Sequence, residues 1–453
     1  MIYFDNASSR LYSDSLIPNI IDINLNKDWN ISFNDKLYSN PHSLNNTSLE
    51  TTNKVNEVRN KVLKYVNASP EIYECIFTSG TTHSLKIIGE YFDWSPNNKF
   101  IYTLDNHTSV IGIREYALKN GSTIEVIDFE DNKIENINSF FDVNSRNKKK
   151  ISDIIDAIDV SNNTDNNINL FVMPAESNFS GKLYDRELIN EVRNKYGDTI
   201  FIYDVAKYIS TNRVDMSDNL IDIIPISFYK IFGFPTGLGA LIIKKSVAKY
   251  LKKTYYGGGS ILINSAYNNY HEKNTNFVEK YEDGSPNYIN IIYLDKFLDK
   301  SMDYVKTKNI TFYFFEKIRE LIHNNGQKVF QIYDINLEYN FEDFCKKHGS
   351  IITFNLLNCE GNFIGYRNVE LLLNSNNIAV RTGCLCNSGS CMKNLKISPE
   401  LLKHYFSLGH SCNNIIDIID NKPTGAIRAS FCETNNIEEV DKFIEIIKLN
   451  YVL

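Results

Sequence analysis

The sequence of 453 residues has little of three things: cysteine, excess basic charge and long hydrophobic runs. Its 8 cysteines are too few for a disulfide framework in a chain of this length. Its 48 Lys and Arg residues are outnumbered by 55 Asp and Glu residues, and the net charge of −7 argues against a nucleic-acid binder. No run approaches the roughly 18 apolar residues that a membrane-spanning helix needs. We therefore expect neither nucleic-acid nor membrane partners.

The remaining composition is that of an ordinary globular protein. Hydrophobic residues make up 43% and charged residues 23% of the chain, which excludes whole-chain disorder and collagen-like repeats. The first residues, MIYFDNASSRLYSDS, lack a basic segment followed by an apolar one, so we expect a cytoplasmic protein.

Seven short runs rich in Ile, Phe, Tyr and Val predict strands that are buried on both faces. Amphipathic segments such as 84–92 and 186–196 lie between several of them and predict helices. This alternation predicts a large, mostly parallel, seven-stranded α/β/α domain. The predicted strands are 72–78, 99–104, 123–128, 168–173, 199–204, 221–227 and 238–244.

Two segments extend the predicted large domain. The segment 48–66 predicts a helix packed ahead of the sheet, and the Asn-rich stretch 130–167 predicts a solvated insertion. One face of that helix carries Val55, Val58, Val62 and Val66.

The C-terminal third predicts a smaller α+β domain. A long helical pattern at 291–323 leads out of the large domain, and a last helix is expected at 437–449. We therefore predict a large domain over 1–295, with an N-terminal arm that contributes to the small domain, and a small domain over 296–453.

Polar and reactive residues follow the predicted strands at their carboxyl ends, the edge where open α/β sheets bind ligands. The turn Ser79-Gly80-Thr81-Thr82 precedes a helix and could hold a phosphate or a carboxylate, although an ordinary helix N-cap has the same pattern. Four further predicted strands end at or lead into Asp105-Asn106-His107, Ser177-Asn178, Asp204 and Ser227-Phe228-Tyr229-Lys230.

Three of these residues suggest a cofactor. The apolar neighbours of Lys230 would lower the pKa of its amine and let it form an imine with a carbonyl compound. A buried Asp204 needs a cation such as a pyridinium nitrogen, and the ring of His107 could stack on a flat cofactor. A snorkelling loop lysine and a satisfied loop histidine are the plainer alternatives. Together with the Ser-Gly-Thr-Thr turn, the three residues meet the demands of pyridoxal phosphate.

The cysteines are concentrated in RTGCLCNSGSC (381–391) and GHSC (409–412). One interpretation is a zinc site, because Cys and His in this number can supply four ligands, although the spacing is not that of a standard knuckle. The other is a loop thiol beside Arg381, whose charge favours the thiolate and so makes a nucleophile.

With these residues in place, the chain resembles class V pyridoxal-phosphate enzymes, and within them the sulfurase domains of molybdenum cofactor sulfurases. The resemblance runs from residue 3 to 431 and implies the type I fold of pyridoxal-phosphate-dependent transferases and a homodimer. The similar stretches are YFDNASSRLYS, NPHS, FTSGTTHSLK, DNHTSVIGIRE, PAESNFSGK, SFYKIFGFPTGLGALII, YYGGGS, YEDGSPNY, RTGCLCNSGSC and GHSCNNIIDIIDNKPTGAIRASF.

The resemblance also implies a role for each matching position. Lys230 would bond the cofactor, Asp204 would face its ring nitrogen, and His107 would stack on its ring. Cys386 would be the sulfur nucleophile, in the Arg-x-Gly-x-x-Cys pattern shared with cysteine desulfurases, with Arg381 at the base of its loop. The other implied positions are Thr81, Thr82 and Ser227 on the phosphate, Ser285 reaching that phosphate from a second subunit, and Asn178 and Arg428 on the substrate carboxylate.

Three features depart from the family pattern. Lys207, in DVAK, stands where relatives carry Gln or Ser near the phenolic oxygen of the cofactor. Tyr229 stands where many desulfurases have His, although the sulfurase branch shares Tyr. Eukaryotic members continue into a domain that holds the molybdenum cofactor, whereas this sequence ends at residue 453.

We therefore expect a cysteine desulfurase-type sulfurtransferase. It would take sulfur from L-cysteine as a persulfide on Cys386, leave alanine, and pass the sulfur to molybdenum cofactor or its carrier protein. One alternative delivers sulfur to iron–sulfur clusters or tRNA, and another is a class V aminotransferase or lyase that handles no sulfur. A non-enzyme alternative is a catalytically silent or zinc-binding partner protein.

Overall fold

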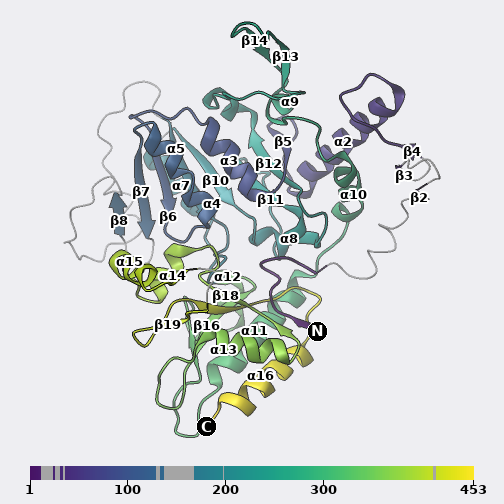
Figure 1. Ribbon diagram of the computed structural model, residues 1–453. Helices are drawn as coiled ribbons and strands as arrows, with labels where there is room; N and C mark the ends of the chain where they lie inside the picture. Colours follow the sequence, from purple (N-terminus) through teal and green to yellow (C-terminus); the bar gives the residue numbers. More distant parts are fainter. Residues whose placement is uncertain are drawn as a thin grey trace.

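In the computed structural model the chain forms a large unit on an eight-stranded sheet and a small unit on a four-stranded sheet (Figure 1). The structure describes residues 1–11, 24–25, 31–33, 36–128, 133–136, 168–196, 198–411 and 415–453. Strands β2 (Asn24–Leu25), β3 (Ile31–Phe33), β4 (Lys36–Leu37) and β8 (Lys133–Asn136) are described by their backbone alone.

The large sheet has the strand order β5-β12-β11-β10-β9-β6-β7-β8. Strands β12 and β8 run antiparallel to their neighbours, and the other six point the same way. The seven strands besides β8 are β5 (Tyr73–Thr78), β6 (Lys99–Thr103), β7 (Thr123–Asp128), β9 (Asn169–Pro174), β10 (Thr199–Asp204), β11 (Ile223–Ser227) and β12 (Gly239–Lys244).

This sheet confirms the predicted α/β class and all seven predicted strands, whose ends lie close to the expected ones. The sequence did not predict the eighth strand, β8, which lies in the stretch 130–167 expected to be a solvated insertion. A strand at the edge of a sheet pairs on one side only, so its sequence, KIEN, lacks the apolar continuity of a buried strand. Residues 137–167 lie outside the described residues.

Helices cover both faces of the large sheet. Helices α2 (Asn46–Tyr65), α7 (Glu187–Tyr196) and α10 (Tyr288–Leu298) pack on one face. Helices α3 (Thr81–Tyr91), α4 (Thr108–Ile111) and α5 (Arg114–Lys119) pack on the other. The valines predicted to share one face of α2 are buried in the core, as is Val66, which follows the helix. The shorter elements of this unit are η1 (Tyr208–Ser210), α8 (Phe228–Phe232), η2 (Lys245–Tyr250), β13 (Ile261–Asn264), β14 (His271–Lys273) and α9 (Phe277–Tyr281).

The small unit is built on the antiparallel sheet β15-β16-β21-β18. The N-terminal strand β1 (Ile2–Tyr3) joins it by pairing with β17 (Ile378–Ala379), and Phe4 packs in its core. Its strands are β15 (Phe330–Ile332), β16 (Ile351–Leu356), β18 (Arg381–Gly383), β21 (Ala426–Ser430) and the hairpin β19 (Ile418–Ile419) and β20 (Lys422–Pro423). Its helices are α11 (Tyr304–Glu320), α12 (Phe341–Lys347), α13 (Tyr366–Ser375), α14 (Ser388–Asn394), α15 (Pro399–Ser407) and α16 (Ile437–Tyr451).

The helical pattern at 291–323 is two helices, α10 and α11, and not one long helix. Asp303 interrupts the pattern as an N-cap, because its side chain accepts a hydrogen bond of 2.8 Å from the backbone N–H of Lys306. The chain passes from the large to the small unit at this break (Figure 1). Among the described residues, no helix is long and apolar enough to span a bilayer.

Candidate functional site

A cavity of about 190 Å³ lies at the carboxyl ends of the central strands, where the sequence analysis expected a ligand. Eight of the predicted site residues line it together. The lining residues are Thr81, Thr82, His107, Pro174, Glu176, Asn178, Asp204, Ala206, Lys207, Ser227, Tyr229 and Lys230.

Lys230 lies in the short helix α8, which begins directly after β11. Burial lowers the pKa of its amine, and the nearby positive charges of Arg428 and Lys207 lower it further, while Asp204 acts in the opposite sense. Lys230 forms no hydrogen bond or ion pair with any residue that the structure describes. A lowered pKa favours the neutral amine, and a neutral amine without a partner is the form that attacks a carbonyl carbon.

Asp204 is the last residue of β10 and is buried. One carboxylate oxygen accepts a 3.0 Å hydrogen bond from the backbone N–H of Ala206. Since its negative charge lies close enough to act on both His107 and Lys230, the carboxylate faces the cavity that these side chains line. A carboxylate held in this way is suited to a cationic group of a ligand.

His107 is the N-cap residue of α4, and its Nδ1 accepts a 3.1 Å hydrogen bond from the backbone N–H of Ser109. This bond places the ring at the wall of the cavity. Burial lowers the pKa of His107, and the charge of Lys230 lowers it further. The ring is therefore held largely neutral, as an aromatic surface facing the cavity.

The phosphate turn predicted at Ser79–Thr82 forms the start of α3, with Gly80 at a φ of +140°. The hydroxyl of Ser227 accepts a 2.8 Å bond from the backbone N–H of Thr81 and donates a 2.9 Å bond to the Thr81 hydroxyl. A Cβ on Gly239 of β12 would lie 2.5 Å from the Cα of Gly80, so only glycine fits there. Strand β12 thus packs tightly behind the turn. The backbone N–H groups and hydroxyls of the turn suit an oxyanion.

Lys207 also lines the cavity, but its ammonium group is fully engaged. It lies 3.3 Å from the carboxylate of Glu176 and donates hydrogen bonds of 2.7 Å to Ser350 and 3.1 Å to Thr211. Ser350 directly precedes β16 of the small unit. Lys207 therefore ties the two units together at the wall of the cavity. This role could not be predicted from the sequence, because the partner Ser350 is 143 residues away.

Cys386 is exposed in the loop between β18 and α14 and has a free thiol. Leu385 and Cys386 both have left-handed backbone conformations, with φ of +60° and +56°. The Leu385 carbonyl accepts a 2.7 Å bond from the Asn178 side chain, and the Cys386 carbonyl accepts a 2.7 Å bond from the Thr108 backbone N–H. The loop is thus docked on the residue that follows His107.

A disulfide joins Cys384 to Cys391 and brackets Cys386. Two of the sulfur atoms in the zinc interpretation are consequently not free to bind a metal in this form of the protein. Cys412, a further candidate ligand, lies outside the described residues. Of the two interpretations of this cluster, the geometry favours the loop thiol.

Asn178 and Arg428 are held together, as expected for residues that share a ligand. Arg428 is buried on β21 and donates a 2.7 Å hydrogen bond to the Asn178 carbonyl. It also binds Asp5 and Ser8 of the N-terminal arm, at 3.1 and 2.9 Å, while its Nε–H is buried without an acceptor among the described residues. Burial lowers the pKa of Arg428.

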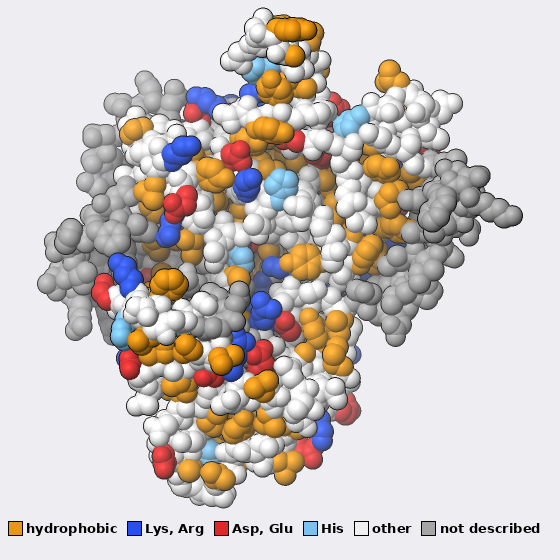
Figure 2. Space-filling view, viewed as in Figure 1, with side chains coloured by type: hydrophobic (Ala, Val, Ile, Leu, Met, Phe, Trp, Pro, Cys, Tyr) orange, Lys and Arg blue, Asp and Glu red, His pale blue; other side chains and the backbone are white. Residues whose placement is uncertain are grey.

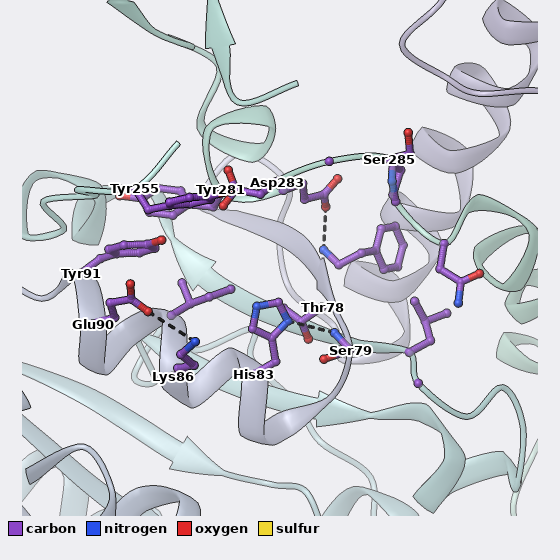
Figure 3. Close-up of a pocket in the computed structure, with 18 residues that line it drawn as sticks. Thr78, Ser79, His83, Lys86, Glu90, Tyr91, Tyr255, Tyr281, Asp283 and Ser285 are labelled. Atoms are coloured by element: carbon purple, nitrogen blue, oxygen red, sulfur yellow. Dashed lines mark hydrogen bonds and ion pairs between the residues drawn. The ribbon is translucent and has the colours of Figure 1, made fainter. Parts of the chain in front are cut away.

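Four predicted residues are not among those that line the cavity: Cys386 and Arg428, described above, and Arg381 and Ser285. Arg381 is exposed on β18, in register with Arg428 on the neighbouring strand. Ser285 is exposed and lines a second cavity of about 590 Å³, opposite His83 and Lys86 of α3 (Figure 3). That second cavity adjoins the phosphate turn, because Ser79 lines it as well.

Sequence reasoning did not single out three residues that organise the site. Glu176 pairs with Lys207, Asp5 pairs with Arg428, and Asp105 binds the cysteine loop. Asp105 follows a predicted strand, and this position was the only feature of the sequence that could have pointed to it. The other two lie in the stretches YFDNASSRLYS and PAESNFSGK that resemble the family, but their partners are distant in sequence, so the sequence did not indicate these pairings.

Comparison with known proteins agrees with this geometry. The family model "Aminotransferase class-V" matches residues 28–152 and 145–443. A molybdenum cofactor sulfurase from Oryza sativa is 36% identical over the whole of this chain, which spans 56% of that protein's length. The chain thus spans about half the length of the curated relatives it matches.

Solved structures share the fold. A cysteine desulfurase from Thermococcus onnurineus is similar with a TM-score of 0.71 and 21% identity, over 99% of this chain and 94% of that one. A C-DES protein with glycine covalently linked to its PLP cofactor is similar with a TM-score of 0.65 and 13% identity, over 99% and 96%. On the strength of the family match, which covers most of the sequence, the chain belongs to the class V aminotransferase family.

Proposed function

We propose that this protein is a pyridoxal-phosphate-dependent sulfurtransferase of the cysteine desulfurase type. The observation that carries the proposal is the juxtaposition of an uncommitted buried amine and an exposed thiol. Lys230 lines the cavity, and the Cys386 loop is docked on Thr108, next to His107 at the same cavity. The negative charge of a Cys386 thiolate would lie close enough to act on both Lys230 and Arg428.

The residues of the cavity fit pyridoxal phosphate. The turn at Gly80 and Thr81, with the hydroxyl of Ser227, suits the phosphate, and Gly239 packs closely against the backbone of this turn. Asp204 would meet the ring nitrogen and keep it protonated. His107 would stack on the ring, and Lys230 would bond the aldehyde carbon. Thr82 would add a second hydroxyl at the phosphate.

When bound, the cofactor supplies an electron sink for bonds to the α-carbon of an attached amino acid. The residues of this chain then have distinct tasks. The freed Lys230 amine takes the proton from the α-carbon of L-cysteine, a role favoured by its lowered pKa. Cys386 attacks the substrate sulfur, so that a sulfur–sulfur bond forms as the carbon–sulfur bond breaks. The thiol proton passes to the organic product, which leaves as alanine, and Cys386 retains the sulfur as a persulfide.

The substrate carboxylate would be bound by Arg428 and Asn178. The Nε–H of Arg428 is buried without an acceptor among the described residues, and a carboxylate is the partner that would satisfy it. Arg381 is exposed, whereas Arg428 is buried, which supports a role for Arg381 at the base of the loop more than direct substrate contact.

We further propose that the sulfur acceptor is molybdenum cofactor. This rests on the relatives named molybdenum cofactor sulfurase, which match nearly the whole chain at about 35% identity. The cofactor would be presented to the exposed Cys386 by a carrier protein or by a further domain. A cytoplasmic location stays a prediction from the sequence.

The proposed enzyme is a homodimer in which Ser285 reaches the phosphate turn of the partner subunit. Two features support this. Ser285 is exposed and does not line the cavity around Lys230 in its own chain. The hairpin β13–β14 nearby projects from the surface with apolar side chains exposed (Figure 2), namely Leu262, Ile263, Tyr267 and Tyr270.

The proposal is tested with purified protein loaded with pyridoxal phosphate and given L-cysteine labelled with heavy sulfur. Peptide mass spectrometry should find the label as a persulfide on Cys386, with alanine released in equal amount. A Cys386→Ser variant should bind cofactor normally but retain no labelled sulfur. Cys359→Ser, which removes another partly exposed free thiol, should behave as wild type. Full sulfur transfer by Cys386→Ser would contradict the proposal.

A further inference from the structure

Asp105 lies two residues after the end of β6 and is almost fully buried, with 8% of its surface exposed. Its carboxylate receives four hydrogen bonds from side chains. One oxygen accepts from Asn387 at 2.5 Å, Ser390 at 2.6 Å and Ser177 at 2.8 Å, and the other accepts from Tyr184 at 3.0 Å. A carboxylate accepts hydrogen bonds on both oxygens, whereas the amide of an Asn side chain accepts them on its oxygen only.

Two of these donors belong to the loop that carries Cys386. Asn387 follows the thiol residue directly, is completely buried, and caps α14 by accepting a 3.1 Å bond from the backbone N–H of Ser390. Its amide nitrogen also donates a 3.0 Å bond to the Asn178 side chain. Asp105 therefore fixes the residue next to Cys386 and the first turn of the helix that follows.

The segment from Asp105 to Thr108 also carries His107 and the Thr108 N–H group that binds the Cys386 carbonyl. The start of α14 also packs closely against the residue before Asp105, because a Cβ on Gly389 would clash with the carbonyl group of Leu104. One short stretch of backbone thus positions the aromatic ring at the cavity and the loop that bears the thiol. The left-handed conformations of Leu385 and Cys386 need such external support.

We infer that Asp105 is a positioning residue for sulfur transfer, which sets the place of the Cys386 thiol relative to the cavity. The inference deepens the proposed function and rests on it for the identity of the reaction. Asp105 touches neither the proposed cofactor nor the substrate, and it acts through Asn387 and Ser390. A displacement of about 1 Å at a reacting group can cost on the order of 100-fold in rate.

The experiment compares Asp105→Asn with Asp128→Asn in the cofactor-loaded protein. Asp128 ends the neighbouring strand β7 and binds Lys393 of the same helix α14 at 2.8 Å, so its variant loosens that helix without touching the loop around Cys386. Single-turnover labelling measures the rate of persulfide formation on Cys386. Hydrogen exchange at the Thr108 amide, measured before cysteine is added, reports whether the loop stays docked.

We expect Asp105→Asn to slow persulfide formation about 10- to 100-fold, with the cysteine concentration for half-maximal rate unchanged. Exchange at Thr108 should accelerate, and Asp128→Asn should match wild type in all three measurements. A persulfide rate within about twofold of wild type, or an equal loss in Asp128→Asn, would overturn the inference.

A milder variant covers the case in which Asp105→Asn does not fold. Ser390→Ala removes one donor from the carboxylate, and we expect a smaller loss of rate in the same direction, whereas an unchanged rate would count against the inference. If the wild-type protein forms no persulfide, the proposed function fails. The exchange measurement then still decides whether Asp105 holds the loop.

Discussion

Two lysines line the cavity, and their partners separate their roles. Lys207 is bound to Glu176 and to hydroxyl groups on both units, whereas Lys230 has no partner among the described residues. Burial lowers the pKa of both amines. Only Lys230 is therefore available to react, and Lys207 is a structural cation in the wall of the cavity.

Lys207→Met should destabilise the protein by about 3 kcal/mol, since it leaves the buried carboxylate of Glu176 without its cation. Urea denaturation of the unloaded protein measures this loss. The double variant Lys207→Met with Glu176→Gln should recover part of it, because both charges are then absent. A single variant as stable as wild type would show that the ion pair does not support the fold.

The lowered pKa of Lys230 makes stability depend on pH in a defined direction. Between the lowered folded pKa and the ordinary unfolded value of 10.5, the unfolded chain binds more protons at this residue than the folded chain does. The contribution of Lys230 to stability therefore rises with pH across that window, and the full cost of its burial is present below it.

Lys230→Met should accordingly be more stable than wild type near neutral pH in the unloaded state, and the difference should shrink as the pH rises. Denaturant titrations at several pH values measure this difference in the free energy of unfolding. Lys249→Met, at an exposed position, should show no such trend. A stability difference that stays constant or grows with pH would contradict a lowered pKa for Lys230.

At the residue scale, the sequence predicted that side chains following the strands would lie close together, because parallel strands bring their carboxyl ends to one edge of the sheet. Lys230, Asp204 and His107 meet at the cavity for this reason. It could not predict the pairing of Lys207 with Ser350 or of Arg428 with Asp5, since contacts between distant segments leave no local pattern.

At the scale of elements, the packing of β12 against the start of α3 shapes the phosphate turn. Gly239→Ala would force a Cβ against the Gly80 backbone, and neither backbone can yield without moving its strand or turn. We expect a stability loss of about 1–3 kcal/mol and a loss of cofactor affinity of about tenfold or more.

Thermal unfolding and the cofactor spectrum measure these two effects. Gly112→Ala is the matched control, because Gly112 has a helical conformation and a Cβ there would meet only ordinary contacts. Normal cofactor binding by Gly239→Ala would show that the turn does not hold the phosphate.

Helices and strands could be predicted from the sequence where their apolar residues form a continuous run or a regular row. The seven strands with continuous apolar runs were found, and so was α2 with its row of valines. The edge strand β8 was missed because it lacks that run, and the break between α10 and α11 was missed because apolar residues recur on both sides of Asp303.

At the scale of the whole molecule, the proposed dimer predicts that Ser285 acts on the partner's site. Ser285→Ala should weaken cofactor affinity by about 10- to 100-fold, the effect of losing a hydrogen bond to a charged group. In dimers that pair a Ser285→Ala chain with a Lys230→Ala chain, only the first chain can bond the cofactor, and it borrows an intact Ser285 from the second.

The affinity of that mixed dimer should therefore return to the wild-type value, which a titration of the cofactor spectrum measures. An affinity that stays as weak as in the Ser285→Ala homodimer would show that Ser285 serves its own chain or that no such dimer forms. The sequence could suggest this arrangement only through family resemblance, because one chain does not display its interface.

In the proposed enzyme Lys230, and no other amine, anchors the cofactor within reach of the Cys386 loop. Its most direct test is to load the protein with pyridoxal phosphate, reduce the linkage with borohydride and map the modified lysine by peptide mass spectrometry. We expect a single modified residue, Lys230, and loss of the modification in Lys230→Ala. Modification of Lys207, or of a lysine outside the cavity, would contradict it.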